Sequence, residues 1–374
     1  MGKKFTNQFR PRAGETPGGN LMRKMQEYRL KGKQIFIGLE DSKRTWKLCV
    51  RSQGMIVHET GMPAKFAVLQ EYLRNNYPDC RIKLLYEAGF GGFWLNDLLE
   101  ENGIECIVTP AHKVTQEKVN KVKTDRVDAR RLALNLENAD YVVCAVPDRE
   151  RREDRQISRT LSQMQDKIIS TKNQIRRLFD YHGLNEDYPA GAWERSHYES
   201  LKSLKLSKPL QMCLSAYLSL LETLEKLQAN LLLQLKELTR KERYCESVKL
   251  KESCPGIGWL TAIRLTLEWG DLTRFAGGKQ LASYTGLTSS EYSTGETIHR
   301  GRITGQGSGR IRGWLIQCAW RAIVLDPVML NKFQRVWKNS GSKKKGIVAV
   351  ARKLAVRIRA LELSKQPYAI GVIE

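Results

Sequence analysis

Two long runs of apolar residues, spaced alternately by three and four positions, constrain the fold of this 374-residue chain more than any other feature. Such seams are typical of helices that bury one stripe along their whole length. They predict two long helices within residues 149–245, which pair as an antiparallel coiled-coil hairpin, face other protomers, or pack as ordinary core helices of one protomer. Every seam member except Thr171 and Gln228 is apolar or aromatic. The seams occupy positions 157, 161, 164, 168, 171, 175 and 178, and positions 210, 214, 217, 221, 224, 228, 231, 235 and 238.

Residues 34–148 have a different pattern, in which short apolar runs of strand character alternate with amphipathic segments of helical period. Three strands are expected first, then a helix, a strand, a second helix and a further strand. A meander followed by a strand–helix–strand unit is typical of a mixed α/β sheet. The expected strands are residues 34–40, two runs within 45–59, 80–89 and 104–111, and the expected helices are residues 64–76 and 93–102.

The chain carries a large excess of positive charge, with 63 Lys and Arg residues against 40 Asp and Glu residues and a formal net charge of +23. This excess favours a polyanionic partner, of which nucleic acid is the commonest and an anionic membrane surface is the competitor. A membrane span would need about eighteen consecutive apolar residues, and neither such a run nor a signal-peptide core is present. The eight cysteines form no Cys-x-x-Cys pair, which favours reduced cytoplasmic thiols over a zinc site or a disulfide framework.

Four carboxylates fall at the ends of the expected elements. Glu40 ends the first strand and Glu87 ends the fourth, whereas Asp125 and Asp128 open the helix that follows the fifth strand. If the first and fourth strands are parallel neighbours, both glutamates emerge at the edge where open α/β sheets bind ligands. Carboxylate oxygens suit Mg²⁺, and two such ions can clamp the oxygens of a phosphoryl displacement. We therefore expect an acidic metal pocket within a basic surface that holds nucleic acid.

Two alternatives for these acids stay open. The two aspartates lie one helical turn apart, so they would equally form surface salt bridges with Lys121 and Arg131. Asp41 directly follows Glu40 and is a rival metal ligand. Because side chains alternate between the two faces of a strand, residues 40 and 41 point to opposite sides, and this alternation favours Glu40.

The second half of the chain contains a Pro-Gly motif, "SCPGIG", at residues 253–258. The motif predicts either a simple turn before a helix or the hairpin of a helix-hairpin-helix module. In such a module the backbone N–H groups around Gly256 and Gly258 approach a phosphate without obstruction by side chains. The sequence favours neither interpretation.

A basic, glycine-rich stretch follows, in which residues 299–312 contain four Arg, four Gly and no acid. It is either a flexible solvated loop or a phosphate-binding loop that presents a hydroxyl group. Ser293 lies just before it, in an expected turn that exposes side chains. A serine nucleophile needs nearby charge to stabilise a pentacovalent phosphorane, and arginines supply it. The candidate phosphate-binding residues are Arg300, Arg302, Arg310 and Arg312.

Together these motifs carry a family resemblance. "IFIGLEDSK", "LLYEAGFGGFWL" and "VKTDRVDARRLA" resemble the RuvC-like half of the insertion-sequence-110 family of transposases, which are DEDD recombinases guided by a bridge RNA. "PGIG", "RFAGGKQLASYTGL", "EYSTGETIHRGRITGQGSGRIRGW" and "LIQCAWRA" resemble the C-terminal transposase domain of the same family. The resemblance covers about residues 34–330. It implies that Glu40, Glu87, Asp125 and Asp128 hold Mg²⁺, and that Ser293 is the nucleophile.

The chain departs from the family pattern at three positions. Glu40 stands where the family has Asp, Gly305 where it has Lys, and Ser308 where it has Asn. These departures bear on the geometry of the metal site and on contacts that the Lys and Asn side chains would make. Rival hydroxyl groups near the expected nucleophile belong to Ser289, Ser290 and Thr294.

The resemblance implies an RNA-guided DNA transposase, a recombinase that breaks and rejoins donor and target DNA through a covalent phosphoserine. It further implies a bridge RNA partner, a tetramer of two dimers, no membrane, and a place in the bacterial cytoplasm beside the nucleoid. One alternative is a metal-dependent RuvC-like nuclease or Holliday-junction resolvase that uses water as nucleophile. Another is a non-catalytic nucleic-acid-binding protein.

The expected organisation has five parts. The N-terminal arm is basic, the RuvC-like DEDD domain has a ribonuclease-H-like α/β fold, and the linker helices join it to a mainly helical transposase domain with a basic helical tail. The corresponding ranges are residues 1–33, 34–148, 149–245, 246–330 and 331–374.

Overall fold

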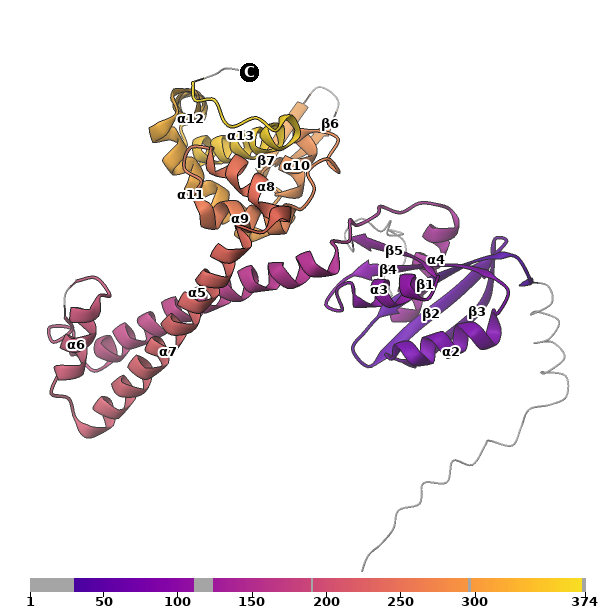
Figure 1. Ribbon diagram of the computed structural model, residues 1–374, viewed down its shortest axis with the longest axis horizontal. Helices are drawn as coiled ribbons and strands as arrows, with labels where there is room; N and C mark the ends of the chain where they lie inside the picture. Colours follow the sequence, from indigo (N-terminus) through magenta and orange to yellow (C-terminus); the bar gives the residue numbers. More distant parts are fainter. Residues whose placement is uncertain (1–29, 111–123, 190, 295–296, 372–374) are drawn as a thin grey trace, which may run out of the picture. The chain divides into compact units, whose positions relative to one another are not determined.

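The computed structural model describes residues 30–110, 124–189, 191–294 and 297–371 (Figure 1). The chain divides into two compact units, Met1–Val146 and Pro147–Glu374. Most of the expected basic arm, and also Lys121, lies outside the described residues.

The N-terminal unit is built on one five-stranded mixed sheet, as the sequence pattern predicted. Its strands are β1 (Gln34–Asp41), β2 (Thr45–Ser52), β3 (Met55–Pro63), β4 (Arg81–Ala88) and β5 (Glu105–Pro110). The spatial order is β3-β2-β1-β4-β5, with the meander antiparallel and β1, β4 and β5 parallel. Because Leu39 of β1 lies opposite Tyr86 of β4, the carboxyl ends of these two strands meet at the same edge of the sheet.

Helices cover both faces of this sheet. One face packs against α2 (Phe66–Asn76) and α3 (Trp94–Glu101), whose leucines cluster with the odd-numbered residues 35, 37 and 39 of β1. The even-numbered residues of β1 face α4 (Asp125–Glu137) on the other side, where Phe36 packs with Leu132. Because side chains alternate along a strand, the odd- and even-numbered residues of β1 pack against different helices.

Gly38 lets α4 approach β1 closely. A Cβ atom added at Gly38 would lie 2.2 Å from the carbonyl oxygen of Ala129 and 2.3 Å from the backbone nitrogen of Ala133, both in α4. No side chain fits between the helix and the strand at this point. The glycine thus sets how near the first turn of α4 comes to the end of β1.

The C-terminal unit begins with the two long helices that the seams predicted, α5 (Arg149–Tyr181) and α7 (Lys208–Leu238) (Figure 1). The connection between them contains α6 (Arg195–Ser203). The two long helices pack antiparallel, because residues near the start of α5 contact the end of α7 and residues near the end of α5 contact its start. Leu161 clusters with Leu235 and Leu238, whereas Phe179 clusters with Leu214 and Leu218.

The predicted seams of α5 and α7 are buried against each other within one chain. Leu161, Ile175, Leu221 and Leu235 are fully buried, and the other apolar seam members are buried or partly buried. Of the three arrangements that the sequence allowed, the structure excludes seams that face other protomers, because the two helices pack antiparallel within one chain. These seam positions are therefore not available to contact other protomers.

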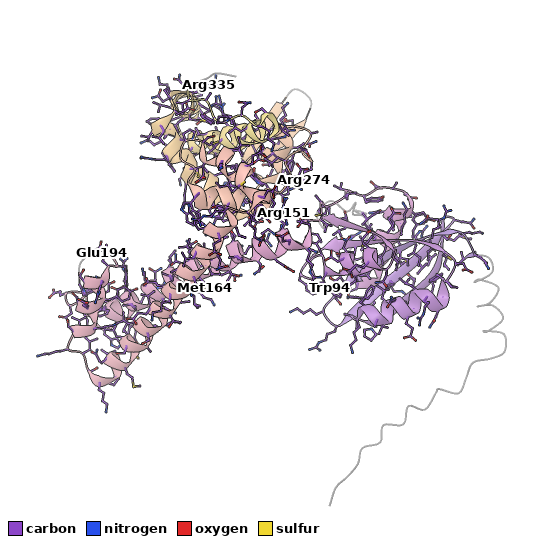
Figure 2. The ribbon with its side chains drawn as sticks, in the orientation of Figure 1. Trp94, Arg151, Met164, Glu194, Arg274 and Arg335 are labelled. Carbon is purple, nitrogen blue, oxygen red and sulfur yellow. The ribbon has the colours of Figure 1, made fainter. Side chains whose placement is uncertain are left out.

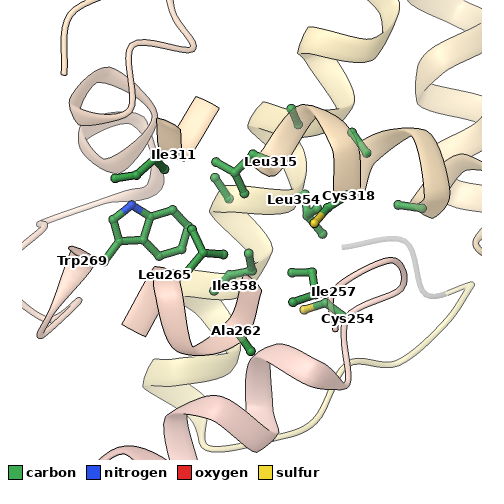
Figure 3. Packing of buried hydrophobic residues seen from close by; sticks show 14 of the residues in the cluster. Cys254, Ile257, Ala262, Leu265, Trp269, Ile311, Leu315, Cys318, Leu354 and Ile358 are labelled. Atoms are coloured by element: carbon green, nitrogen blue, oxygen red, sulfur yellow. The ribbon is translucent and has the colours of Figure 1, made fainter. Parts of the chain in front are cut away.

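The remainder of the C-terminal unit is a helical domain with a single core (Figure 3). Buried residues from helices far apart in the sequence meet there, including Leu265, Leu315, Leu354 and Ile358. The helices are α8 (Glu242–Glu252), α9 (Trp259–Trp269), α10 (Gly278–Tyr284), α11 (Gly309–Leu325), α12 (Pro327–Ser340) and α13 (Lys343–Ser364).

Helix α13 belongs to this core, although residues 331–374 were expected to form a basic tail outside the transposase domain. Ile347, Val350, Leu354 and Ile358 form a buried stripe along it. Lys343, Lys344 and Lys345 of α13 are exposed, whereas Arg357 is buried and pairs with Asp326 at 3.3 Å. The many positive charges of this helix hid its buried stripe in the sequence pattern. The expected boundary at residue 330 runs through one continuous core.

A two-stranded antiparallel hairpin lies where the sequence suggested a turn followed by a loop. Its strands are β6 (Ser289–Thr294) and β7 (Thr297–Ile303), and Ser293 lies opposite Ile298. The Gly- and Ser-rich composition had suggested a loop, but the two strands satisfy each other's backbone hydrogen-bonding groups. Ser293 consequently lies in a strand rather than in the expected turn, and its side chain is exposed there.

Candidate active site

Glu87 and Asp128 are brought together by one arginine. The Nη2 atom of Arg131 lies 3.1 Å from the Oε1 atom of Glu87 and 3.0 Å from the Oδ1 atom of Asp128. Asp128 is buried, with 5% of its surface exposed, and the Glu87 side chain is 22% exposed. The pairing of Asp128 with Arg131 is the salt bridge that the simpler interpretation of this helix expected. The same arginine also reaches the end of β4, so the pair extends from the helix to the sheet.

Glu40 and Asp41 lie on opposite faces of the sheet. Glu40 has the same parity as Phe36 and Gly38, which face α4, so it is on the side of Asp128. Asp41 is on the other side, where its Oδ1 atom accepts a hydrogen bond of 2.8 Å from the indole nitrogen of Trp46. Burial raises the pKa of Asp41, and this hydrogen bond opposes the rise.

Asp125 is exposed in the first turn of α4 and lies one turn before Asp128. The helix begins after Thr124, whose side chain accepts a hydrogen bond from the backbone N–H of Val127. Two acids in the first turn interact favourably with the positive end of the helix dipole. The cap and the dipole together fix the end of the helix from which both aspartates project.

The arginines that flank the aspartates on α4 have their own partner on the sheet. Arg126 and Arg130 both donate to Glu59 of β3, and the Arg126 contact measures 2.8 Å. Hydrogen bonding from Arg130, followed by that from Arg126, lowers the pKa of Glu59 to about 2. This contact ties α4 to the meander, whereas Arg131 ties it to β4.

Two acids of this site supply carboxylate oxygens, the ligands that a hard divalent cation prefers. Carboxylate oxygens from Glu87 and Asp128 converge on a single positive charge, which Arg131 supplies, and Glu40 emerges on the same face of the neighbouring strand. Across residues 30–110 and 124–371, apart from the gaps noted above, no three His, Cys, Asp or Glu side chains are grouped closely enough to hold a metal ion. The site is thus a converged pair of acids with a third acid on the same side of the sheet.

In the C-terminal unit, Ser293 has a carboxylate beside it. Its hydroxyl donates a hydrogen bond of 3.0 Å to the Oε1 atom of Glu291. Both residues are exposed on β6, and because strand side chains repeat every second residue they share one face. Sequence reasoning missed Glu291 because it took "EYSTG" for a turn. The alternation of Ser289, Glu291 and Ser293 was the available signal for a strand.

The rival hydroxyl groups differ in their surroundings. Ser290 donates a hydrogen bond of 3.1 Å to the carbonyl oxygen of Arg302 across the hairpin. Ser289 begins β6 opposite Ile303. The side chain of Thr294 lies outside the described residues. Of the described serines in this hairpin, Ser293 is the one whose hydroxyl points to an acid.

The four candidate arginines are not equivalent. Arg312 donates through one nitrogen to the carbonyl oxygens of Thr285, Gln306 and Gly307, at 3.0 to 3.3 Å, so it holds the loop before α11 in place. Arg302 and Arg310 are exposed. The side chain of Arg300 lies outside the described residues.

The Pro-Gly motif forms the short connection between α8 and α9. Gly256 has a positive φ of 84°, and a Cβ atom there would lie 2.5 Å from the carbonyl oxygen of Cys318 in α11. Glycine is therefore required at position 256, both by the positive φ of the turn and by the close packing against α11. Gly258 precedes α9, is exposed, and has open space around its Cα.

A polar cleft of about 720 Å³ lies beside the start of α11. On one side is Arg159 of α5, which makes a two-pronged contact of 2.8 and 2.9 Å with Glu268 of α9. On the other side is Arg310, one of the candidate phosphate-binding residues. The remaining lining residues are Gln156, Gln163, Ser308 and Gly309.

Helices α12 and α13 add a further basic surface, which covers most of the segment that the sequence predicted to be a basic helical tail. Residues 327–361 contain no Asp or Glu. Lys332 has a lowered pKa because of its burial and of the nearby charges of Arg335 and Arg352. Arg335 projects from the surface of the C-terminal unit (Figure 2). A concentration of like charges of this kind suits a polyanion.

Comparison with known proteins decides the family. A profile of the transposase IS116/IS110/IS902 family matches residues 249–334, and a DEDD transposase profile of IS110 elements matches residues 37–182. The putative transposase y4rJ of Sinorhizobium fredii (strain NBRC 101917 / NGR234) is 30% identical over 366 residues, which cover 87% of this chain and 90% of that protein. The chain belongs to the IS110 family of transposases.

Two further relatives agree with this membership. The putative transposase y4qE of the same Sinorhizobium strain is 27% identical over 277 residues, covering 74% of this chain and 67% of that protein. The transposase for insertion sequence element IS1111A of Coxiella burnetii (strain RSA 493 / Nine Mile phase I) is 24% identical over 279 residues, covering 71% and 73%. The two IS110 profiles together match both the half with the acids and the half with Ser293.

Family membership makes this chain a DNA-processing enzyme of an insertion sequence, and the DEDD class to which its N-terminal half belongs typically uses a divalent metal. The α/β sheet with acids at one edge agrees with a DEDD nuclease-like fold. None of the described helices is both long enough and apolar enough to span a bilayer.

Proposed function

We propose that this IS110-family transposase breaks and rejoins DNA by phosphoryl transfer, with Ser293 as nucleophile and the acids of the N-terminal unit as the metal site. The observation that carries the proposal is the meeting of Glu87 and Asp128 at Arg131, where the sheet edge and the first turn of α4 come together. A basic chain that gathers acids at one point suits an enzyme that holds a polyanion and a cation at once.

The proposed metal is Mg²⁺, held by Glu40, Glu87, Asp125 and Asp128. When bound, it supplies positive charge and orientation to the oxygens of the scissile phosphate. Glu87 and Asp128 bind it from the sheet and the helix, and Glu40 does so from the same face of β1. Glu is one methylene longer than the Asp of the family, so the carboxylate of Glu40 would reach one methylene further from β1 toward the metal.

Ser293 is proposed to attack the phosphorus atom of a DNA phosphodiester. Its Oγ–P bond forms as the P–O3′ bond breaks, which leaves a phosphoserine and a free 3′-hydroxyl group. The proton of the serine hydroxyl passes through Glu291, the carboxylate to which it is hydrogen-bonded, and ends on the departing 3′-oxygen. Attack by a second 3′-hydroxyl reverses these steps and reseals DNA without an external energy source.

Positive charge near Ser293 would stabilise the phosphorane. Arg302 and Arg310 are exposed and are the described arginines proposed to contact phosphate, whereas Arg312 positions the loop that precedes α11 and Arg310. Arg300 is assigned the same phosphate contact from its place in β7. Gly256 and Gly258 would add backbone N–H contacts to a neighbouring phosphate, in the manner of a helix-hairpin-helix module.

We propose that a bridge RNA selects the donor and target DNA, and that the enzyme works as a tetramer of two dimers at the bacterial nucleoid. Support for a guide is indirect: the net charge of +23 suits contacts to phosphate backbones, which carry no sequence information. A tetramer would allow the serine of one protomer to meet the acids of another.

Cleavage by purified protein, RNA and duplex DNA carrying the element ends tests the proposal. Asp128→Asn should abolish cleavage but leave nucleic-acid affinity nearly unchanged, because it removes a metal ligand and no cationic contact. Wild-type protein should yield a protein–DNA adduct that survives denaturant. Cleaved DNA with no adduct at any time would instead favour a nuclease that uses water, and normal cleavage by Asp128→Asn would exclude Asp128 as a ligand.

A further inference from the structure

The β6–β7 hairpin presents an exposed aromatic side chain beside the proposed nucleophile. Tyr292 directly precedes Ser293 in β6 and is 78% exposed. It lies opposite His299 of β7, which is also exposed. Residues directly opposite each other on antiparallel strands point to the same face, with their Cβ atoms about 5 Å apart. Tyr292 and His299 therefore place two rings side by side on one face of the hairpin.

The two faces of the hairpin differ in chemistry. Ser293 and Glu291 share one face, where the serine hydroxyl donates its hydrogen bond to the carboxylate, and we call this the serine face. Tyr292 and His299 define the other, which we call the aromatic face. Because side chains alternate along a strand, the two faces begin one residue apart in β6, a rise of about 3.4 Å.

A bulge in β7 brings a positive charge to the aromatic face. The register shifts between Ser289 and Glu291, so β7 has one more residue in this interval than β6. Ile303 pairs with Ser289 and consequently lies on the serine face. Arg302 precedes Ile303 by one residue, so its exposed side chain points to the aromatic face. Without the extra residue, Arg302 would lie on the serine face.

Small residues separate the aromatic ring from this arginine. Ser290 shares the face of Tyr292, and a Cβ atom added at Gly301 would lie 2.4 Å from the Oγ atom of Ser290. The Ser290 hydroxyl donates a hydrogen bond of 3.1 Å to the carbonyl oxygen of Arg302, which holds the bulge in place. The aromatic face is therefore shallow between the ring of Tyr292 and the guanidinium group of Arg302.

A shallow aromatic platform next to a guanidinium group suits an unstacked nucleobase. Every base has a π face that can stack on a tyrosine or histidine ring, and an arginine beside the ring can contact the phosphate of the same nucleotide. Among the hairpin side chains that the structure describes, Glu291 is the acid, and it lies on the serine face. The charge of the aromatic face thus favours nucleic acid over a protein partner.

We propose that Tyr292, with His299 beside it, stacks on the DNA base next to the phosphate that Ser293 attacks. The DNA strand crosses the outer edge of β6, with the phosphate on the serine face and the base of the neighbouring nucleotide on the aromatic face. In the described sheet β6 pairs with β7 alone, so this edge is open to DNA. Bases on opposite sides of a protein strand cannot stack on each other, and the ring of Tyr292 replaces the lost neighbour. The inference rests on the proposed role of Ser293.

Substitution of the ring tests the stacking in the full-length chain. Tyr292→Leu should slow cleavage of duplex DNA carrying the element ends by about tenfold or more, because leucine is apolar but has no π face. Tyr292→Phe keeps the ring and should restore most of the rate. Tyr181→Leu is a matched control, since Tyr181 is 86% exposed at the end of α5, outside the hairpin. Cleavage by Tyr292→Leu at the wild-type rate would overturn the proposal.

An abasic nucleotide tests the same contact from the DNA side. In the Ser293→Ala chain, which binds without reacting, removal of the base next to the break should weaken binding about tenfold. In the chain that also carries Tyr292→Leu, the same abasic DNA should bind as well as intact DNA. An equal loss of affinity in both proteins would show that the base has another partner and overturn the proposal.

Photo-cross-linking identifies the partner of the base directly. DNA with 5-iodouracil next to the break, irradiated with the Ser293→Ala chain, should yield a cross-linked peptide that contains Tyr292 or His299. Cross-links of this hairpin to RNA alone, or to another protein chain alone, would overturn the proposal.

Failure of the stacking is distinguishable from failure of the proposed chemistry. A base cross-linked to Tyr292, in a transposase whose wild-type chain never forms the covalent adduct, would refute Ser293 as nucleophile and leave the stacking. An adduct on Ser293, together with normal cleavage by Tyr292→Leu, would refute the stacking and leave the nucleophile.

Discussion

Glu87 and Asp128 meet at a single nitrogen atom, the Nη2 of Arg131, although 40 residues, including all of β5, lie between them in the sequence. The contact joins the end of β4 to the first turn of α4. A guanidinium group and a divalent ion satisfy the same pair of carboxylates, so Arg131 competes with metal for them. This competition gives the proposed metal site an observable that does not depend on catalysis.

Arg131→Met should make the stability of the N-terminal unit depend on Mg²⁺. Without the arginine, two partly buried carboxylates repel each other and lack a donor, which should cost about 1–3 kcal/mol of unfolding free energy. Millimolar Mg²⁺ should then raise the Tm of the variant more than that of the wild type, as calorimetry would measure. Arg126→Met is the control, because Arg126 is 65% exposed and pairs with Glu59. Equal Mg²⁺ responses in all three proteins would contradict the site.

Glu40→Gln and Asp41→Asn separate two adjacent acids by function. Glu40 lies on the α4 side of β1, so its amide variant should lose cleavage by at least about 100-fold while the fold is retained. Asp41 accepts a hydrogen bond from Trp46 on the opposite side, so its amide variant should cleave DNA and instead lower the unfolding free energy by about 1 kcal/mol. Cleavage rates and denaturant unfolding measure the two effects. Loss of cleavage in Asp41→Asn, with normal cleavage in Glu40→Gln, would show that Asp41 rather than Glu40 holds the metal.

Glu59 makes the N-terminal unit sensitive to acid. Its pKa of about 2 lies below the ordinary value of 4.5, chiefly through hydrogen bonding from Arg130, so its stabilisation is complete above pH 4.5 and is lost as the pH falls toward 2. Glu59→Gln should lower the unfolding free energy at neutral pH by about 1 kcal/mol, because the arginines are exposed, and should flatten its decline between those pH values. Scanning calorimetry at several pH values measures this. If the unfolding free energy of Glu59→Gln fell with pH as steeply as that of the wild type, the acid sensitivity would come from other acids.

The sheet and its acids were accessible to sequence reasoning because strands alternate with period two and end at definable residues. That periodicity predicted the mixed sheet, and it predicted that Glu40 and Asp41 face opposite sides of it, as they do in the structure. The contact of Arg131 with Asp128 was expected from their spacing on one helix. Its contact with Glu87 was not predictable, because it depends on how closely Gly38 lets α4 approach β1. Helical period likewise predicted α5 and α7, but spacing alone could not say that the seams face each other.

Amino-acid composition gave wrong predictions in two segments, where strand pairing or helix packing determines the structure. Gly, Ser and Arg suggested a loop around Ser293, yet β6 and β7 satisfy each other's backbone groups and hold Glu291 beside the serine. Lysines and arginines suggested a tail after residue 330, yet Val350 and Leu354 of that segment are fully buried. In both places the deciding contacts come from residues distant in the sequence or from the partner strand.

The covalent adduct is the most direct test of the proposed chemistry. Wild-type transposase, trapped on cleaved DNA and digested to peptides, should carry the nucleotide on Ser293, and Ser293→Ala should give neither adduct nor cleavage while it still binds DNA. Ser290→Ala is the matched control and should form the adduct normally, because that hydroxyl is bonded to the carbonyl oxygen of Arg302. A nucleotide found on another residue, or an adduct that persists in Ser293→Ala, would contradict the account.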